Sequence, residues 1–175
     1  GYLSLYASLL SILVVVASLR YHLAIPQPEN DEDGAALLVA SGAAVGLTTA
    51  VTALLLAWQG PRLLHWLDAE VLAPHMWLIP LGLLGAGAYQ VLSYWAIREG
   101  AFRPLAVTKL TQGAMLAGSQ IAFGLLGMGP VGLMLGDAIG RAAGSGALGR
   151  LTLAGGARFD RTVRARIARV LARYR

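Results

Sequence analysis

Apolar residues gather into stretches of about twenty along this chain, separated by short polar clusters or by glycine and proline. A helix needs about that length to cross roughly 30 Å of hydrocarbon. The pattern therefore predicts an all-α fold, a polytopic transmembrane helix bundle of about five spans. We expect the spans near residues 2–25, 35–58, 76–97, 105–126 and 131–148. Residues 62–75 mix charges with apolar positions, which is typical of a short helix on the membrane surface.

The same pattern divides the chain into two segments. Residues 1–150 form the transmembrane bundle, and residues 151–175 form a basic linker. Apolar residues of the linker recur three and four positions apart from Phe159 to Tyr174, and arginines fill most of the remaining positions. This spacing predicts a cationic amphipathic helix, either on an anionic cytoplasmic lipid surface or docked onto a protein.

The composition also indicates a chain that is embedded in a lipid bilayer. Hydrophobic residues make up 57% of the chain and charged residues 13%, against about 25% charged in soluble domains. The chain has no cysteine, and its three histidines are scattered, so we expect no metal site. We also expect no enzyme, no cofactor and no nucleic-acid partner, because the sequence has no nucleophile elbow, phosphate-binding loop or basic-aromatic module.

Lysine and arginine are distributed unequally between the two sides of the predicted bundle. One side has Arg62 alone, whereas the other holds the linker from Arg150 onward and four cations at span ends: Arg20, Arg98, Arg103 and Lys109. The positive-inside rule places the linker in the cytoplasm, as expected for a multi-pass protein of the inner (plasma) membrane. The four cations either reach toward lipid phosphates or form an anion funnel at the cytoplasmic mouth.

Polar side chains inside the spans share helical faces. Gln90 and Tyr94 lie four residues apart in the third span, and Gln112 occupies a polar face of the fourth. Because hydrocarbon penalises polar groups, these two faces either line one wet cleft or form hydrogen bonds between helices.

The fifth span combines a charge pair with a regular glycine pattern. Asp137 and Arg141 lie four residues apart and can neutralise each other. The alternatives are ion coupling by Asp137 and capture of a lipid headgroup by Arg141. Glycine recurs every four residues at 132, 136, 140 and 144, which predicts a face that packs closely against another helix, with a substrate groove as the alternative.

Two stretches resemble a known family. Residues 18–26 (SLRYHLAIP) with 31–36 (DEDGAA), and residues 89–98 (YQVLSYWAIR) with 102–103 and 109–112, resemble the cytoplasmic loops of polysaccharide biosynthesis flippases of the O-antigen type. These belong to the multidrug, oligosaccharidyl-lipid and polysaccharide exporter superfamily. Two features depart from the family pattern: His22 stands where an acidic residue is expected, and the loop from Arg98 to Arg103 is less basic than usual.

The resemblance implies that this chain is a fragment of the amino-terminal lobe, retaining helices two to six and ending in the linker to the second lobe. Such proteins work by alternating access, moving an isoprenoid-lipid-linked oligosaccharide through a cationic cavity for the synthesis of lipopolysaccharide, O-antigen, capsule or exopolysaccharide. The implied partners are that substrate, membrane lipids and the carboxy-terminal lobe of the same protein.

The residues and the resemblance together yield candidate roles but no catalytic residue. Asp137 is the candidate for ion coupling. The candidates for substrate binding are Arg20, Arg98, Arg103, Lys109, Arg141, Gln90, Tyr94 and Gln112. Two other functions remain open: a drug or metabolite exporter of the same superfamily, and a non-transporting membrane scaffold for glycan assembly.

Overall fold

The computed structural model describes residues 2–17, 21–27, 30–66, 68 and 70–154, and within these residues the chain is helical without any strand. The prediction of an all-α fold is confirmed for this part of the chain. The elements in order are α1 (Tyr2–Ala17), the 3-10 helix η1 (Tyr21–Ala24), α2 (Asp31–Trp66), the 3-10 helix η2 (Glu70–His75), α3 (Leu78–Arg98), α4 (Phe102–Leu125), α5 (Gly129–Ala142) and α6 (Ser145–Ala154).

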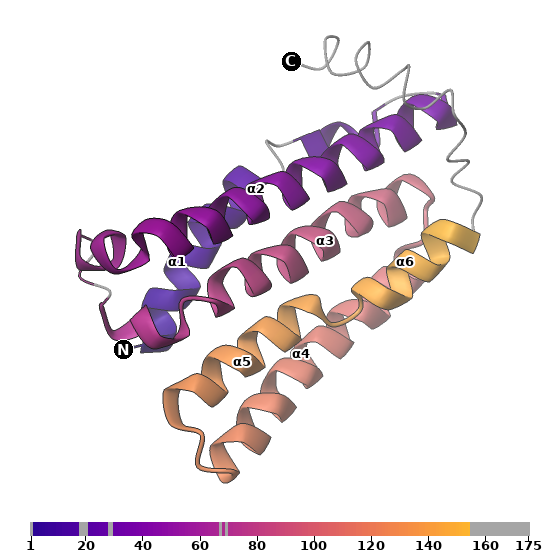
Figure 1. Cartoon of the computed structure of the whole chain (residues 1–175). Helices are drawn as coiled ribbons and strands as arrows, with labels where there is room; N and C mark the ends of the chain where they lie inside the picture. The colour runs from indigo at the N-terminus through magenta and orange to yellow at the C-terminus, as the bar shows by residue number, and fades with distance from the viewer. Residues whose placement is uncertain (1, 18–20, 28–29, 67, 69, 155–175) are drawn as a thin grey trace.

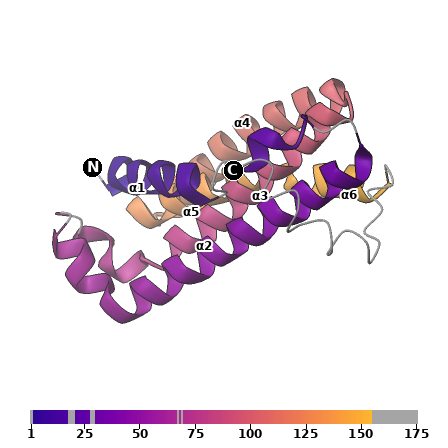
Figure 2. The same cartoon turned by 90° about the horizontal axis from the view of Figure 1, so that it is seen from above.

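Helix α3 is the central element of the bundle. It packs against α1, α2, α5 and α6, while α4 packs along α5 (Figure 1). The view turned by 90° shows the long helix α2 running along one side of this arrangement (Figure 2). The predicted tight turn between the last two spans is present, and Gly127 and Gly129 have positive φ angles there.

The buried core surrounds the two ends of α3. One apolar cluster, which includes Ile25 and Trp95, joins η1 and the start of α2 to the end of α3. A second cluster, which includes Leu10 and Met134, joins α1, η2 and α5 to the start of α3. The Tyr6 hydroxyl also donates a hydrogen bond to the carbonyl of Leu78, at 3.2 Å. Helix α3 is thus anchored to its neighbours at both ends.

Among the described residues, one helix is long and apolar enough to cross a membrane, namely α2 with its 36 residues. Its predicted end at Trp58 is instead a bend. Gln59 leaves the helical region (φ −128°, ψ 15°), and Pro61 follows two residues later. Proline lacks an N–H and its ring clashes with the carbonyl four residues earlier, so the helix kinks before continuing to Trp66. The predicted surface segment 62–75 therefore consists of the end of α2 and the short helix η2.

The prediction of one continuous helix over 131–148 is wrong. Helix α5 ends at Ala142, Ala143 is extended (φ −60°, ψ 136°), and Gly144 has a φ of +86°. Glycine adopts that φ without the steric penalty that a side chain would bring. The Ser145 hydroxyl then donates a hydrogen bond to the carbonyl of Ala142 at 2.7 Å, and α6 begins.

The predicted boundary between bundle and linker at residue 150 is also wrong, because α6 runs through it. Leu148 of α6 is buried against Tyr89 and Ala96 of α3, which makes α6 part of the bundle. The amphipathic helix predicted for the rest of the linker falls in residues 155–175, outside the described residues.

The glycine pattern of the fifth span is a packing face, as predicted. A Cβ atom built at Gly140 would lie 2.6 Å from Leu116 Cβ and 2.8 Å from Leu116 Cα. At Gly136 it would lie 2.6 Å from Gln120 Cγ. Any side chain larger than hydrogen would therefore push α5 away from α4. Gly118, on α4, has no atom within 4 Å of the corresponding position.

Helix α4 is apolar toward the outside. Thr108 is its one buried residue, although all of α4 is described, whereas Leu110 is 75% exposed and Leu125 is 85% exposed. Leu47 and Leu54 of α2 are exposed as well. An apolar exterior of this kind is rare on soluble monomers. It matches a hydrocarbon environment or contact with further helices.

We expect Gly140→Ala to lower the free energy of unfolding by about 1–3 kcal/mol, because the added methyl group overpacks the contact with Leu116. Gly118→Ala is the matched control, because its methyl group meets open space and alanine favours a helix by about 1 kcal/mol over glycine. Denaturant unfolding of the 175-residue chain in detergent micelles measures both. Equal effects of the two substitutions would contradict the packing role of the glycine face.

Candidate functional site

A cavity of about 760 Å³ lies among α1, α3, α4 and α5. Ligand pockets in proteins have volumes of about 300–1,000 Å³, so this one has room for a sizeable group. Apolar residues such as Val14 of α1 and Leu116 of α4 form part of its wall. Its polar lining consists of Gln90, Ser93 and Tyr94 from α3, Lys109 and Gln112 from α4, and Asp137 and Arg141 from α5.

Helical spacing explains why these polar residues meet. Residues three or four apart project from the same side of a helix, as Gln90 and Tyr94 do on α3 and Asp137 and Arg141 do on α5. The glycine face of α5 brings α4 close, so that Gln112 joins the same cavity. The structure thus places six of the predicted site residues around one space: Gln90, Tyr94, Lys109, Gln112, Asp137 and Arg141.

Asp137 and Arg141 form an ion pair at the cavity wall. The Nε–H of Arg141 donates to Oδ2 of Asp137 at 2.6 Å, and the two side chains are 31% and 9% exposed, respectively. Because an isolated charge in hydrocarbon is costly, each residue compensates the other. The pairing predicted from their spacing is present. Ion coupling by Asp137 and headgroup capture by Arg141 stay predictions.

Gln112 lines the cavity and also forms a hydrogen bond to the backbone at the end of α5. Its Nε2–H donates a hydrogen bond to the carbonyl oxygen of Arg141 at 2.9 Å. The last carbonyls of a helix have no partner within that helix, and α5 ends one residue later at Ala142. Gln112 therefore supplies a donor where the backbone of the fifth segment is interrupted.

Lys109 lies over an aromatic ring at the edge of the cavity. Its Nζ is 4.7 Å from the centre of the Tyr89 ring, a distance at which a cation and a π face attract each other. The Tyr89 hydroxyl is in turn 3.1 Å from the Thr108 hydroxyl, which donates to the Leu105 carbonyl at 2.9 Å. Tyr89 is thereby held in place beneath the ammonium group.

Arg98 belongs to a separate contact outside the cavity lining. Its guanidinium donates to Asp31 Oδ1 at 3.0 Å and to the Ile25 carbonyl at 3.2 Å, and it lies 5.9 Å from the Trp95 ring centre. The side chain is only 8% exposed. A Cβ atom at Gly34 would lie 2.6 Å from its Nε, so glycine is required there. Arg98 fastens the start of α2 to the end of α3.

The predicted funnel of four cations is not gathered at one place. Of the four, Lys109 lines the cavity, whereas Arg98 makes the contact described above. Arg103 is exposed and borders a different hollow of about 330 Å³ between α4 and α6. Arg20 lies outside the described residues.

Comparison with known proteins supplies no relative. No family model, no curated protein and no solved structure matches this chain. The resemblance to polysaccharide flippases therefore stays a prediction from the quoted stretches. The described residues also contain no group of three or more histidine, aspartate or glutamate side chains that could hold a metal ion.

Sequence reasoning missed two features of this site. The Tyr89–Lys109 contact joins residues on two helices across a turn, so no helical periodicity indicates it. The helix break was signalled only by Gly144 followed by Ser145, a pair typical of one helix ending and another beginning. The resulting cavity carries two cations, one carboxylate, two amides and hydroxyl groups on its described lining, a set that can form ion pairs and hydrogen bonds.

We expect Arg98→Ala to lower the free energy of unfolding by about 2 kcal/mol, because it removes charged hydrogen bonds to Asp31 and to the Ile25 carbonyl. The expected loss of stability is limited to this size because Asp31 is 91% exposed to solvent. Arg103→Ala is the matched control at an exposed arginine, and it should leave stability unchanged. An equal loss in both variants, measured by denaturant unfolding in detergent, would argue against a fastening role for Arg98.

We expect single cysteines at Gln90 and Gln112 to react with a small, membrane-impermeant thiol reagent in proteoliposomes, because both residues line the cavity. The chain has no cysteine of its own, so the reagent has no native thiol to react with. Leu81→Cys on the outer side of α3 is the matched control, and it should stay unreactive when lipid covers it. If the cysteine at position 81 reacts and the cysteines at positions 90 and 112 do not, the result contradicts a water-accessible cavity.

Proposed function

We propose that this chain is part of a membrane flippase that carries an isoprenoid-lipid-linked oligosaccharide across a bilayer for polysaccharide biosynthesis. The observation that carries the proposal is the partly open cavity lined by Lys109, Arg141 and further polar side chains, in a bundle with many exposed apolar residues. A lipid tail is soluble in the bilayer, but a diphosphate and its sugars need a polar passage. Arginine and lysine bind phosphate oxygens through charged hydrogen bonds, and amides such as Gln90 suit sugar hydroxyls.

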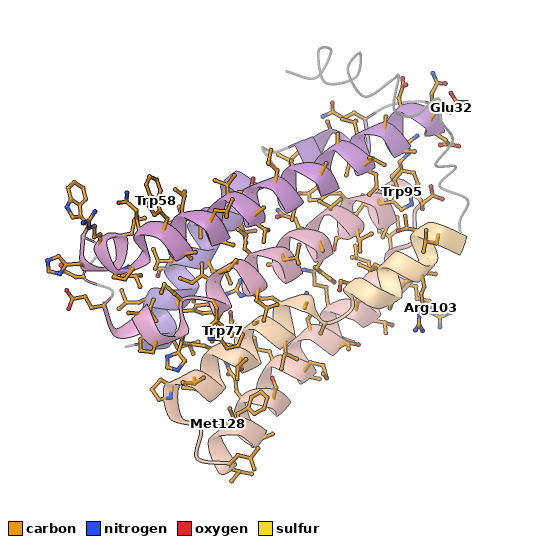
Figure 3. All side chains as sticks on the ribbon, in the orientation of Figure 1. Glu32, Trp58, Trp77, Trp95, Arg103 and Met128 are labelled. Carbon is orange, nitrogen blue, oxygen red and sulfur yellow. The ribbon has the colours of Figure 1, made fainter. Side chains whose placement is uncertain are left out.

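The position of aromatic residues supports a bundle that crosses the membrane. Trp58, Trp66 and Trp77 are all exposed, and tryptophan favours the boundary between lipid and water. Trp58 and Trp77 lie toward one end of the molecule, whereas Glu32 and Arg103 lie toward the other (Figure 3). Exposed tryptophans at one end of the molecule are what we expect for helices that run between two membrane surfaces, and the positive-inside rule would put the end with Arg103 in the cytoplasm.

Five crossings would require α1, with its 16 residues, to cross as a short span, and α5 and α6 to act together. Their 14 and 10 residues are each too few to cross, since a span needs about 20. In sequence they form one crossing interrupted at Ala143 and Gly144. Interrupted helices inside membrane bundles are tolerated where they line a polar cavity, and Arg141, next to the break, does so.

Alternating access would require a second lobe. The cavity is partly open, and the outer side of α4 beside it is apolar and rich in small residues such as Gly113 and Gly118. A carboxy-terminal lobe of the same protein packed on this side would close the cavity to one membrane surface at a time.

Asp137 favours a second candidate function. It is a buried carboxylate in the cavity wall, and acids inside membrane bundles commonly couple transport to protons or metal cations. A drug or metabolite exporter of the same superfamily would use such a residue.

We expect the complete gene product to restore surface polysaccharide in cells whose own lipid-linked oligosaccharide flippase is depleted. Arg141→Gln should reduce this activity at least tenfold at matched membrane levels, because the cavity loses a cation that binds phosphate. Arg62→Gln, which changes an exposed arginine outside the cavity lining, should retain it. The measurement is the amount of polysaccharide at the cell surface.

Failure of the wild type in several polysaccharide backgrounds would count against the flippase. In that case efflux of cationic drugs that depends on Asp137 would point to the exporter. Loss of polysaccharide in a deletion strain, without transport of any lipid-linked substrate in vesicles, would point to a membrane scaffold.

A further inference from the structure

Arg141 already holds an anion that belongs to the protein. Its Nε–H is bonded to Asp137 Oδ2 at 2.6 Å, and both residues line the cavity. Lys109 differs, because its ammonium group lies over the Tyr89 ring. A headgroup that enters the cavity therefore meets one cation resting on a π face and one that is bonded to a carboxylate.

We propose that Asp137 is an internal counter-ion, which neutralises Arg141 while the cavity is empty and is displaced from it by the diphosphate of the incoming lipid. The inference rests on the proposed function and adds a regulatory step to the same site. An arginine without an anion is costly in a membrane bundle, so the empty state needs the pair. Once a diphosphate arrives, two anions compete for one guanidinium, and like charges at close range repel.

The geometry of the guanidinium permits an exchange by steps. Arginine has five N–H donors, and the bond to Asp137 uses the one on Nε. A phosphate oxygen first meets the terminal nitrogens, and a two-pronged grip that includes Nε then requires Asp137 to leave. Gln112 holds the backbone carbonyl of Arg141 at 2.9 Å, so the side chain changes partner while its backbone stays in place.

Return of Asp137 to Arg141 would also promote release. A cavity whose cation is always available would bind its substrate tightly and release it slowly. With Asp137 as a competitor, the empty and the loaded states are closer in free energy, which a transporter needs in order to cycle.

The test is a binding titration of the purified complete protein with geranyl diphosphate, a short and soluble isoprenyl diphosphate. We expect Asp137→Asn to lower Kd about tenfold and to slow transport, and Arg141→Gln to raise Kd at least tenfold. Glu99→Gln, at an exposed acid just past α3, is the matched control and should leave Kd unchanged. Inorganic pyrophosphate forms a second arm, and equal affinity for it would assign the site to free diphosphate instead of a lipid headgroup.

A second measurement uses the unaltered protein and does not depend on the folding of a variant. Solid-state NMR with labelled arginine and aspartate reports the distance from Arg141 Nε to the Asp137 carboxyl carbon, and we expect it to lengthen on saturation with geranyl diphosphate. An unchanged distance at saturation, or an Asp137→Asn protein that binds no tighter than wild type, would contradict the counter-ion role of Asp137. Either result would leave the proposed flippase function unaffected. Absence of any diphosphate binding by the wild type overturns both.

Discussion

The close approach of α5 to α4 determines where the polar residues of this protein meet. Gly136 and Gly140 leave no room for a side chain, so the two helices pack almost backbone to backbone. Lipid is as apolar as leucine, and association of helices in it relies on such contacts and on hydrogen bonds more than on the hydrophobic effect. At this separation Gln112 reaches the Arg141 carbonyl, and Lys109 borders the same cavity as Asp137. A wider spacing would move these groups apart, and they would no longer line one cavity.

The sequence predicted α3 and α4 to within a few residues, because both apolar stretches are bounded by polar residues or glycine, but it missed where α1 and α2 end, at Ala17 and Trp66. The face shared by Gln90 and Tyr94 was equally readable, since it follows from helical spacing alone. The break at Ala143 and Gly144 was not, because both residues are compatible with an apolar span and hydropathy does not register a change of backbone direction. Arg98 was assigned to substrate for a similar reason: its partner Asp31 lies 67 residues earlier, and no local pattern joins them.

Three of the described cations, Arg98, Lys109 and Arg141, divide into two groups by what surrounds them. Arg98 is buried and engaged with a carboxylate, a carbonyl and an indole ring, so its charge serves the joint between α2 and α3. Lys109 and Arg141 line a cavity, and their partners are the Tyr89 ring and the Asp137 carboxylate. The family resemblance pointed to arginines as a class, whereas burial and partners distinguish the ones that hold the fold from those that could meet a ligand.

The interrupted fifth segment has a structural consequence. Helix α5 packs most extensively on α4, while α6 packs most extensively on α3 through Leu148. Helix α3 thus contacts both halves of the segment, whereas α4 packs mainly on α5, and the halves are joined by Ala143 and Gly144. The break itself is held by backbone hydrogen bonds, from Ala143 to Ile139 and Gly140 and from Leu148 to Gly144. One stretch of sequence therefore covers two neighbouring helices beside the cavity and changes direction where it passes from one to the other.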